Sequence, residues 1–179
     1  MNADFTNPAS TASEDAERYI ARLLQLLGDR DPFEVQRELV ARLRELVDGL
    51  DDAALRQPEA PGKWSILEVI GHLADTEAVY RYRMRMSVAQ PGSAIPDYDQ
   101  DLWAGGLRYN DGDLENALRE IEALRAANLA WLEGLSEEEM DRAGVHEERG
   151  VESVRRIVAL LAAHDLVHRN QIQRIKSAL

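Results

Sequence analysis

The amino-acid sequence predicts an all-α protein, a four-helix bundle with a short additional helix at its start. Apolar residues recur every three or four positions in four long segments, which is the spacing of helices with one buried face. Segments containing glycine and proline separate these stretches, and no stretch shows the alternating pattern of a β-strand. Four amphipathic helices in a chain of 179 residues bury their apolar faces by packing together.

The helical pattern begins with a short leader segment, followed by the first helix of the bundle. Asp31-Pro32 separates the two segments, because proline favours the first turn of a helix. One helix broken at this junction is the alternative, and we favour two helices. Residues 1–13 have no period and are expected to form a disordered tail before a single domain, residues 14–179. The leader stripe is Tyr19, Ile20, Leu23, Leu24 and Leu27, and the next stripe is Val35, Leu39, Leu43, Leu46 and Leu50.

The second bundle helix has the clearest start in the chain. Ser65 and Glu68 match a capping box, and Trp64 and Val69 match the hydrophobic staple that flanks such a box. The apolar face that follows extends to about residue 88 and includes His72. We therefore expect the imidazole of this histidine to point into the protein.

A long connection, residues 91–112, joins the second helix to the third. It has no sustained period and contains several glycines and prolines, but it also carries Tyr98, Trp103 and Tyr109. Disordered linkers seldom retain so many aromatic residues, and long connections within compact domains often have a function. We expect an ordered loop that covers one end of the bundle.

The third helix is predicted from about Asp113 to Gly134, with Asn128 on its apolar face. A short capped turn follows it. Residues 141–150 are polar and are expected to form a loop, in which His146 is interpreted as a surface histidine. The fourth helix then extends to the end of the chain.

The fourth helix carries the most informative residues, His164 and His168. Positions i and i+4 lie on the same face of a helix, so both imidazoles can bind one metal ion. Their stripe also contains Ile157 and Ile175, which indicates a buried face where neutral imidazoles need hydrogen-bond partners or a metal. Together with His72 they would hold a divalent ion and leave it an open position, as in catalytic sites.

A second interpretation stays open at this point. The histidines can instead be buried residues that hydrogen-bond to Asn128, Gln171 or the backbone. In a metal site, the same two polar residues are candidates to orient the imidazoles. Asp165 is a candidate catalytic residue, because HDLVH differs from the HExxH motif of zinc proteases by aspartate in place of the glutamate base. Aspartate is shorter, so an orienting contact or a solvent-facing charge fits equally well.

Composition excludes several classes of function. The chain has no cysteine, which excludes disulfides, thiolate ligands and a cysteine nucleophile. A net charge of -12 argues against a nucleic-acid partner. No apolar run is long enough to span a membrane and no signal peptide is evident, so we expect no membrane partner and a cytoplasmic location. Ferritin-like di-iron sites need glutamates and paired ExxH motifs that the sequence lacks.

Three segments together resemble the DinB-like family of four-helix bundles, which includes the YfiT-like thiol transferases. They are PGKWSILEVIGHLADTEAVYRYRM, PDYDQDLWA and HDLVHRNQIQRIK, and the resemblance extends from about residue 19 to the end. It implies an up-down-down-up bundle in which His72, His164 and His168 bind a divalent ion such as zinc or nickel. In family members of known activity, the ion activates a low-molecular-weight thiol such as bacillithiol or mycothiol. Asn170 stands where the family often has glycine.

The resemblance and the residue pattern lead to one functional expectation. We expect a metal-dependent enzyme that catalyses S-transfer from a small thiol to an electrophilic small molecule, in a pocket beneath residues 91–112. Gln171 and Asp165 would tune the imidazoles or move a proton. The alternatives are a hydrolase that uses the ion to activate water, and a bundle that binds a metal or ligand without catalysis. A homodimer through exposed helix faces is also compatible with the sequence.

Overall fold

The computed structural model describes residues 13–179, with side chains described from Arg18 onward. Apart from Ser13, the first residue of the first helix, the expected disordered tail lies outside the described residues. Within the described part of the chain, no helix is long and apolar enough to cross a membrane.

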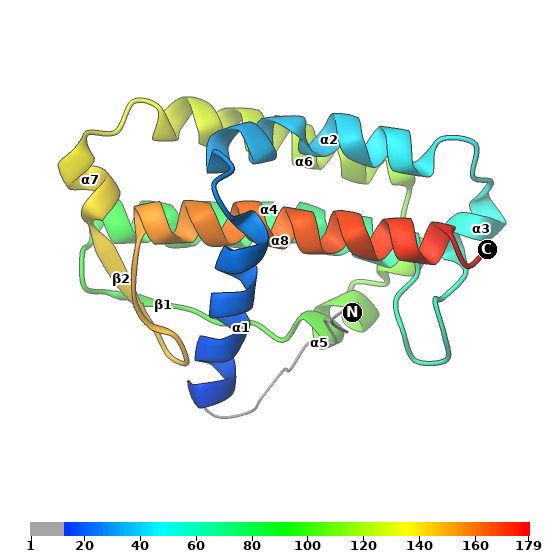
Figure 1. Cartoon of the computed structure of the whole chain (residues 1–179), viewed down its shortest axis with the longest axis horizontal. Helices are drawn as coiled ribbons and strands as arrows, with labels where there is room; N and C mark the ends of the chain where they lie inside the picture. The colour runs from blue at the N-terminus through cyan, green and yellow to red at the C-terminus, as the bar shows by residue number, and fades with distance from the viewer. Residues whose placement is uncertain (1–12) are drawn as a thin grey trace.

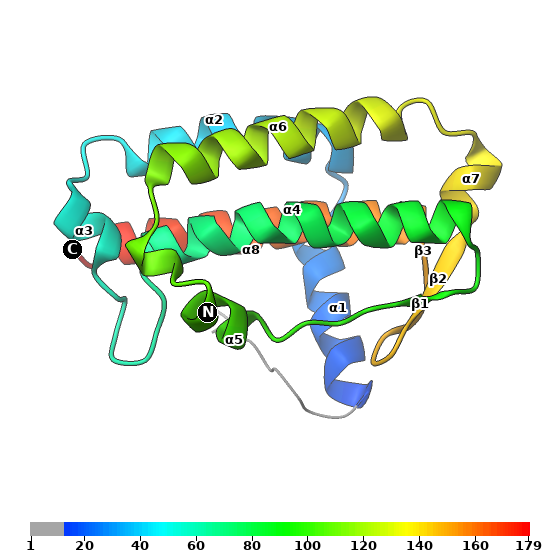
Figure 2. The ribbon, with the colours of Figure 1, turned by 180° about the vertical axis from the view of Figure 1, so that it is seen from behind.

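Four long helices form the predicted bundle. They are α2 (Pro32–Val47), α4 (Ile66–Ala89), α6 (Leu114–Leu132) and α8 (Val154–Lys176). The chain direction reverses between α2 and α4, stays the same for α6 and reverses again for α8 (Figure 1). α2 and α6 lie side by side in one layer, and α4 and α8 form the layer beneath it (Figures 1 and 2). The fold class and the up-down-down-up order are therefore confirmed.

Local sequence signals define the helix ends. Ser65 and Glu68 form the predicted capping box at the start of α4, which satisfies backbone N–H groups that the helix cannot bond itself. The Asp31 carboxylate accepts a hydrogen bond from the backbone N–H of Phe33 at the start of α2. The leader helix, α1 (Ser13–Leu27), ends at Gly28, whose φ of 58° favours glycine. α1 and α2 are thus separate helices, as we favoured.

The connection between α4 and α6 is ordered, as expected, but it follows the side of α4 rather than covering an end of the bundle (Figure 2). Its contact with α4 depends on Gly71, where a Cβ atom would lie 2.8 Å from Cγ of the Tyr109 ring. A larger residue here would displace the connection from the helix turn that carries His72. The connection contains β1 (Ala94–Ile95), α5 (Gln100–Gly106) and a 3-10 turn, η1 (Tyr109–Asp111).

A small sheet corrects the expectation that the chain has no strands. β2 (Ala143–His146) pairs antiparallel with β3 (Gly150–Ser153) and parallel with β1. In a typical strand, buried apolar residues alternate with exposed polar ones, and here this order is inverted. Gly144, His146 and Glu152 face inward, whereas Val145 and Val151 are 41 % and 69 % exposed. A pattern with polar residues inside and valines outside carries no strand signal.

α8 is enclosed on opposite sides, and this enclosure creates a third layer. Residues 160–165 are six consecutive buried positions, so both the bundle side and the outer side of the helix are covered. α1 crosses the outer side of α8, and β1, β2 and α5 also lie on that side of the α4–α8 layer (Figure 1). The short helices α3 (Asp52–Arg56) and α7 (Glu137–Asp141) lie at opposite ends of the bundle (Figure 1).

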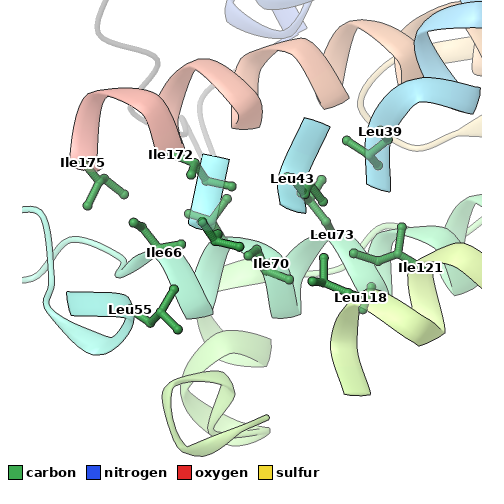
Figure 3. Close-up of a cluster of buried hydrophobic side chains, with 13 residues drawn as sticks. Leu39, Leu43, Leu55, Ile66, Ile70, Leu73, Leu118, Ile121, Ile172 and Ile175 are labelled. Carbon is green, nitrogen blue, oxygen red and sulfur yellow. The ribbon is translucent and has the colours of Figure 1, made fainter. Parts of the chain in front are cut away.

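The main apolar core fills the space between the two layers of the bundle. Side chains from α2, α4, α6 and α8 meet there, joined by Leu55 from α3 (Figure 3). Leu39 and Leu43 of α2 have no exposed surface, like Ile70 of α4 and Leu118 of α6. Burying side chains of this size stabilises the fold by about 1.5–3 kcal/mol each.

We predict that Leu43→Ala lowers the free energy of unfolding by about 2–5 kcal/mol, because it removes buried methyl groups and leaves a cavity. Leu102→Ala is the matched control, since Leu102 is 72 % exposed, and it should change stability by less than about 0.5 kcal/mol. Urea denaturation followed by circular dichroism measures both variants. Equal effects of the two substitutions would contradict this core assignment.

Candidate metal centre

Three histidines from two helices meet in the α4–α8 layer. His72 lies on α4, and His164 and His168 lie one turn apart on α8. The Nε2 atom of His164 is 3.1 Å from Nε2 of His72 and 3.0 Å from Nε2 of His168. Potential ligand atoms of all three residues lie within 4.8 Å of one another. Two segments about ninety residues apart in the chain thus place three ring nitrogens around one point.

Burial keeps these imidazoles neutral. All three residues are 8 % exposed or less. Burial lowers the pKa of His168 to about 4, and it lowers the pKa values of His72 and His164 well below their usual range. Repulsion between neighbouring imidazolium charges lowers the pKa values of His72 and His164 further. A neutral imidazole has a free lone pair, which metal binding requires.

Gln171 selects the tautomer of His168. The Oε1 atom of Gln171 lies 2.8 Å from Nδ1 of His168 and accepts a hydrogen bond from it. With its proton on Nδ1, the ring presents the lone pair of Nε2 to the other two histidines. The Nδ1 atoms of His72 and His164 are buried and have no hydrogen-bond partner among the described residues.

The donor set fits a divalent ion. Zn–N distances of about 2.0–2.1 Å place tetrahedral ligands roughly 3.3 Å apart, close to the two measured N–N distances. Within the described part of the chain, the cluster contains three imidazoles and no carboxylate. Zinc, nickel and other borderline divalent ions accept such nitrogen ligands. Three protein ligands would leave a coordination position for another molecule.

Aromatic and hydroxyl groups surround the imidazoles. The Trp64 ring lies 5.0 Å from the ring of His72 and is stacked 6.4 Å from that of His168, so this residue does more than flank a capping box. The hydroxyl of Thr76 is 3.4 Å from Nε2 of His72 and 3.1 Å from the hydroxyl of Tyr98. A line of polar atoms therefore connects residues 91–112, the crossover segment between α4 and α6, to the histidine cluster.

A pocket adjoins the cluster on the outer side of the α4–α8 layer. It has about 550 Å³ of empty space, part of which is continuous with solvent. α1 contributes Tyr19, α4 contributes Tyr80 and Arg83, the crossover contributes Tyr98, and the β2–β3 loop contributes Arg149. Its position under the crossover agrees with our expectation, but it lies along the side of the bundle rather than at one end. Burial raises the pKa values of Tyr19 and Tyr98 to about 12, so both phenols stay protonated at neutral pH.

Asp165 belongs to a different cluster from the histidines. Its carboxylate oxygens accept hydrogen bonds of 2.6 and 3.1 Å from Arg125, which also donates to Glu77 and to the backbone carbonyl of Gln36. Burial raises the pKa of Asp165 to about 6, although the adjacent guanidinium opposes this shift. Asn128 bonds to Glu77 and Arg81 and makes no hydrogen bond to an imidazole. Of the polar residues proposed to orient the histidines, Gln171 makes such a contact.

His146 is buried rather than exposed, which corrects the interpretation of a surface histidine. Its side chain has no exposed surface, and its Nδ1 atom accepts hydrogen bonds from the backbone N–H groups of Glu148 and Arg149. Its Nε2 atom lies 3.6 Å from the Asp97 carboxylate. Burial, together with nearby guanidinium groups, lowers the pKa of His146 to about 4. This histidine therefore anchors the β2–β3 hairpin, outside the three-histidine cluster.

Several residues around the site were not predicted to line it. Trp64 was expected to form a staple and Arg149 to lie in a polar loop, and no role was expected for Arg83. Tyr98 carried a detectable signal, since an aromatic residue in a long connection indicates an ordered contact. The positions of the two arginines depend on how the hairpin docks, and no local pattern indicates that docking.

Comparisons with known proteins agree with this architecture. A relative from Oceanobacillus iheyensis, provisionally named a metal-dependent hydrolase, is 30 % identical over 138 residues, which cover 77 % of this chain and 78 % of the relative. YfiT from Bacillus subtilis, which has the same provisional name, is 26 % identical over 114 residues, or 64 % of each chain.

The solved structure of Bacillus subtilis YfiT, provisionally described as a metal-dependent hydrolase with an unusual four-helix bundle topology, matches with a TM-score of 0.77. The match has 21 % sequence identity and covers 98 % of this chain and 94 % of that chain, so it supports the fold alone. A family model of the DinB superfamily matches residues 36–172, which is more than half of the sequence. The chain therefore belongs to the DinB superfamily.

Proposed function

We propose that this protein is a metal-dependent enzyme in which His72, His164 and His168 hold a divalent ion, zinc or nickel. The convergence of three neutral Nε2 atoms beside a pocket is the observation that carries the proposal. A bound ion would lower the pKa of a thiol or water at its open side, so that the nucleophilic form exists at neutral pH. The provisional names of the relatives support metal dependence.

The surroundings of the histidines favour a small thiol as the nucleophile, and we assign the reaction as S-transfer to an electrophile. Among the described residues, the side chains next to the imidazoles are Trp64, Thr76, Tyr80, Tyr98 and Gln171, none of which carries a carboxylate or a further imidazole to act as a base. Asp165 is engaged by Arg125. A thiol has a pKa of about 8.5, against about 15.7 for water, so at the same ion and without a neighbouring carboxylate the thiol loses its proton more readily.

The protein's own groups would position the reactants. Gln171 holds the Nδ1 proton of His168 and so fixes the direction of the Nε2 lone pair. Trp64 covers His72 and His168 and limits the access of water to them. The Tyr98 hydroxyl, which lines the pocket and stays protonated, is placed to donate a hydrogen bond to the electrophile.

Hydrolysis of an ester or amide is the second candidate function. The relatives from Oceanobacillus and Bacillus are provisionally named metal-dependent hydrolases, and these names state no substrate. The same three histidines would serve both reactions, which differ in whether a thiol or water attacks the substrate.

Location and assembly complete the proposal. We place the enzyme in the cytoplasm, acting on a small molecule, and a homodimer through exposed helix faces is an assembly compatible with its sequence. The net charge of -12 supports a small-molecule substrate over a nucleic acid.

We predict that purified wild-type protein contains about one divalent ion per chain and that His168→Gln removes most of it, because two imidazoles bind far more weakly than three. His146→Gln is the matched control, since this histidine lies outside the cluster. Elemental analysis of proteins purified without added metal measures the content. Equal metal content in His168→Gln and wild type would show that His168 is not a ligand of the ion.

We predict that turnover of an electrophile such as 1-chloro-2,4-dinitrobenzene by the metal-loaded enzyme requires a small thiol, whose sulfur displaces chloride and forms the dinitrophenyl thioether. Chromatography of the product measures the reaction, and His168→Gln subtracts the uncatalysed background. A nitrophenyl ester tests the alternative reaction. If the enzyme releases nitrophenol at the same rate with and without thiol, and forms no thioether, the result would favour hydrolysis instead.

Gln171→Leu should weaken metal binding by roughly 10- to 100-fold, because the Nδ1 proton of His168 loses its acceptor. Gln173→Leu is the matched control on the same helix, where the glutamine is exposed and bonds to Ser177. Competition with a chromophoric chelator measures both affinities. An unchanged affinity in Gln171→Leu would mean that this hydrogen bond does not position the ligand.

A further inference from the structure

Hydrogen-bond donors dominate the wall of the pocket beside the histidine cluster. The guanidinium groups of Arg83 and Arg149 line it, together with the phenols of Tyr19, Tyr80 and Tyr98, and Asp97 is the one carboxylate among the described lining residues. These residues come from α1, α4, the crossover and the β2–β3 loop, so several distant segments supply donors to one space. A donor-rich wall is complementary to a ligand that carries acceptor atoms.

The guanidinium group of Arg149 is held along one edge, and its other edge is available to a ligand. Its Nε and Nη2 atoms donate to the two carboxylate oxygens of Glu152 at 2.8 and 2.9 Å. Its Nη1 atom has no hydrogen bond among the described residues. Glu152 is 1 % exposed and Arg149 is 17 % exposed, so the bidentate pair fixes the guanidinium from the protein side.

Arg83 is held in a similar way. Its Nε and Nη2 atoms donate to the backbone carbonyl of Pro96 at 2.9 and 2.7 Å, and Nη2 lies 3.6 Å from Asp97. Its guanidinium carbon lies 5.2 Å from the centre of the Tyr80 ring. The side chain is 2 % exposed, yet Nη1 makes no hydrogen bond within the described part of the chain. Two rigidly held guanidinium groups therefore each keep one nitrogen without a partner.

The charge balance of the pocket favours an anion. Asp97 and Glu152 offset the charges of Arg83 and Arg149, and a divalent ion at the histidines would add two positive charges to this region. The rest of the chain has the opposite bias, since the net charge is -12. A carboxylate would supply acceptor atoms for the two Nη1 donors and a negative charge for the ion, whereas a neutral ligand would supply acceptors alone.

We propose that the pocket binds a substrate carboxylate through Arg149 and Arg83, assisted by tyrosine hydroxyls, while the reacting end of the molecule faces the histidines. This substrate class rests on the proposed metal-dependent function. A carboxylate accepts two hydrogen bonds in one plane, which suits the free edge of a fixed guanidinium. Arg149 and Arg83 are thus specificity-determining residues for a small molecule with an anionic end.

A series of hydroxamates that differ in the group opposite the hydroxamate tests this assignment. Their dissociation constants are the measurement, so no turnover assay is needed. The hydroxamate group binds zinc, so acetohydroxamate reports on the metal site alone. The monohydroxamates of succinate and glutarate add a carboxylate at two distances, and their terminal amides are neutral counterparts. Titration calorimetry with the zinc-loaded protein should show that at least one carboxylate binds roughly tenfold or more tightly than its amide.

Arg149→Met should remove that preference and leave the dissociation constant of acetohydroxamate unchanged. Arg42→Met is the matched control, because it removes the same charge from an exposed ion pair on α2 and should keep the preference. If Arg149→Met does not fold, because Glu152 is left buried without its partner, the double variant Arg149→Met/Glu152→Gln replaces it.

The outcomes separate the two proposals. Wild-type protein that fails to bind acetohydroxamate would overturn the metal-dependent function itself. Protein that binds acetohydroxamate but shows no preference for either carboxylate over its amide would overturn the anionic substrate class alone. A preference that persists in Arg149→Met would also overturn it.

Discussion

The hydrogen bonds of Arg125 connect all four helices of the bundle, and the position of the candidate site depends on them. From α6, this guanidinium binds Glu77 of α4, Asp165 of α8 and the backbone carbonyl of Gln36 on α2. Burying these charges is costly unless each is paired, so the helices must keep the register in which the pairs form. The imidazoles lie on the opposite side of the same two helices. On α8, His164 directly precedes Asp165 in sequence. The contacts that fix α4 against α8 on the bundle side therefore also fix the imidazoles on the outer side.

This two-sided use of α4 and α8 explains the third layer. Helices that pack only against a bundle leave a polar face to water, whereas α8 has six consecutive buried residues. α1, the crossover and the small sheet cover the outer side, and between them they enclose the histidines and the pocket. The covering segments also supply Tyr19, Tyr98 and Arg149, so the elements that shield the site line it as well. As we propose, a metal ion shared by the imidazoles and a substrate anion would supply binding partners for the polar groups on this side.

Much of the fold was predictable because its signals are local. The period of the helices, the capping box at Ser65 and the break before Asp31-Pro32 each depend on a few neighbouring residues, and each agrees with the structure. The sheet was missed because its inward residues include Gly144 and Glu152, and its valines face solvent. The three-histidine cluster followed from helical spacing together with a family resemblance. Its location on the outer side of the bundle, and the ion pair of Asp165 with Arg125, depend on which helices are neighbours, which no short-range pattern specifies.

The proposed function requires His72, His164 and His168 to hold one ion with an open position facing the pocket. Anomalous diffraction from crystals of the zinc-loaded protein, recorded on both sides of the metal absorption edge, locates that ion. We expect one strong peak about 2.0–2.1 Å from all three Nε2 atoms, with a non-protein ligand on the pocket side. A peak elsewhere, or an ion whose fourth ligand is a protein side chain that closes the site, would contradict it.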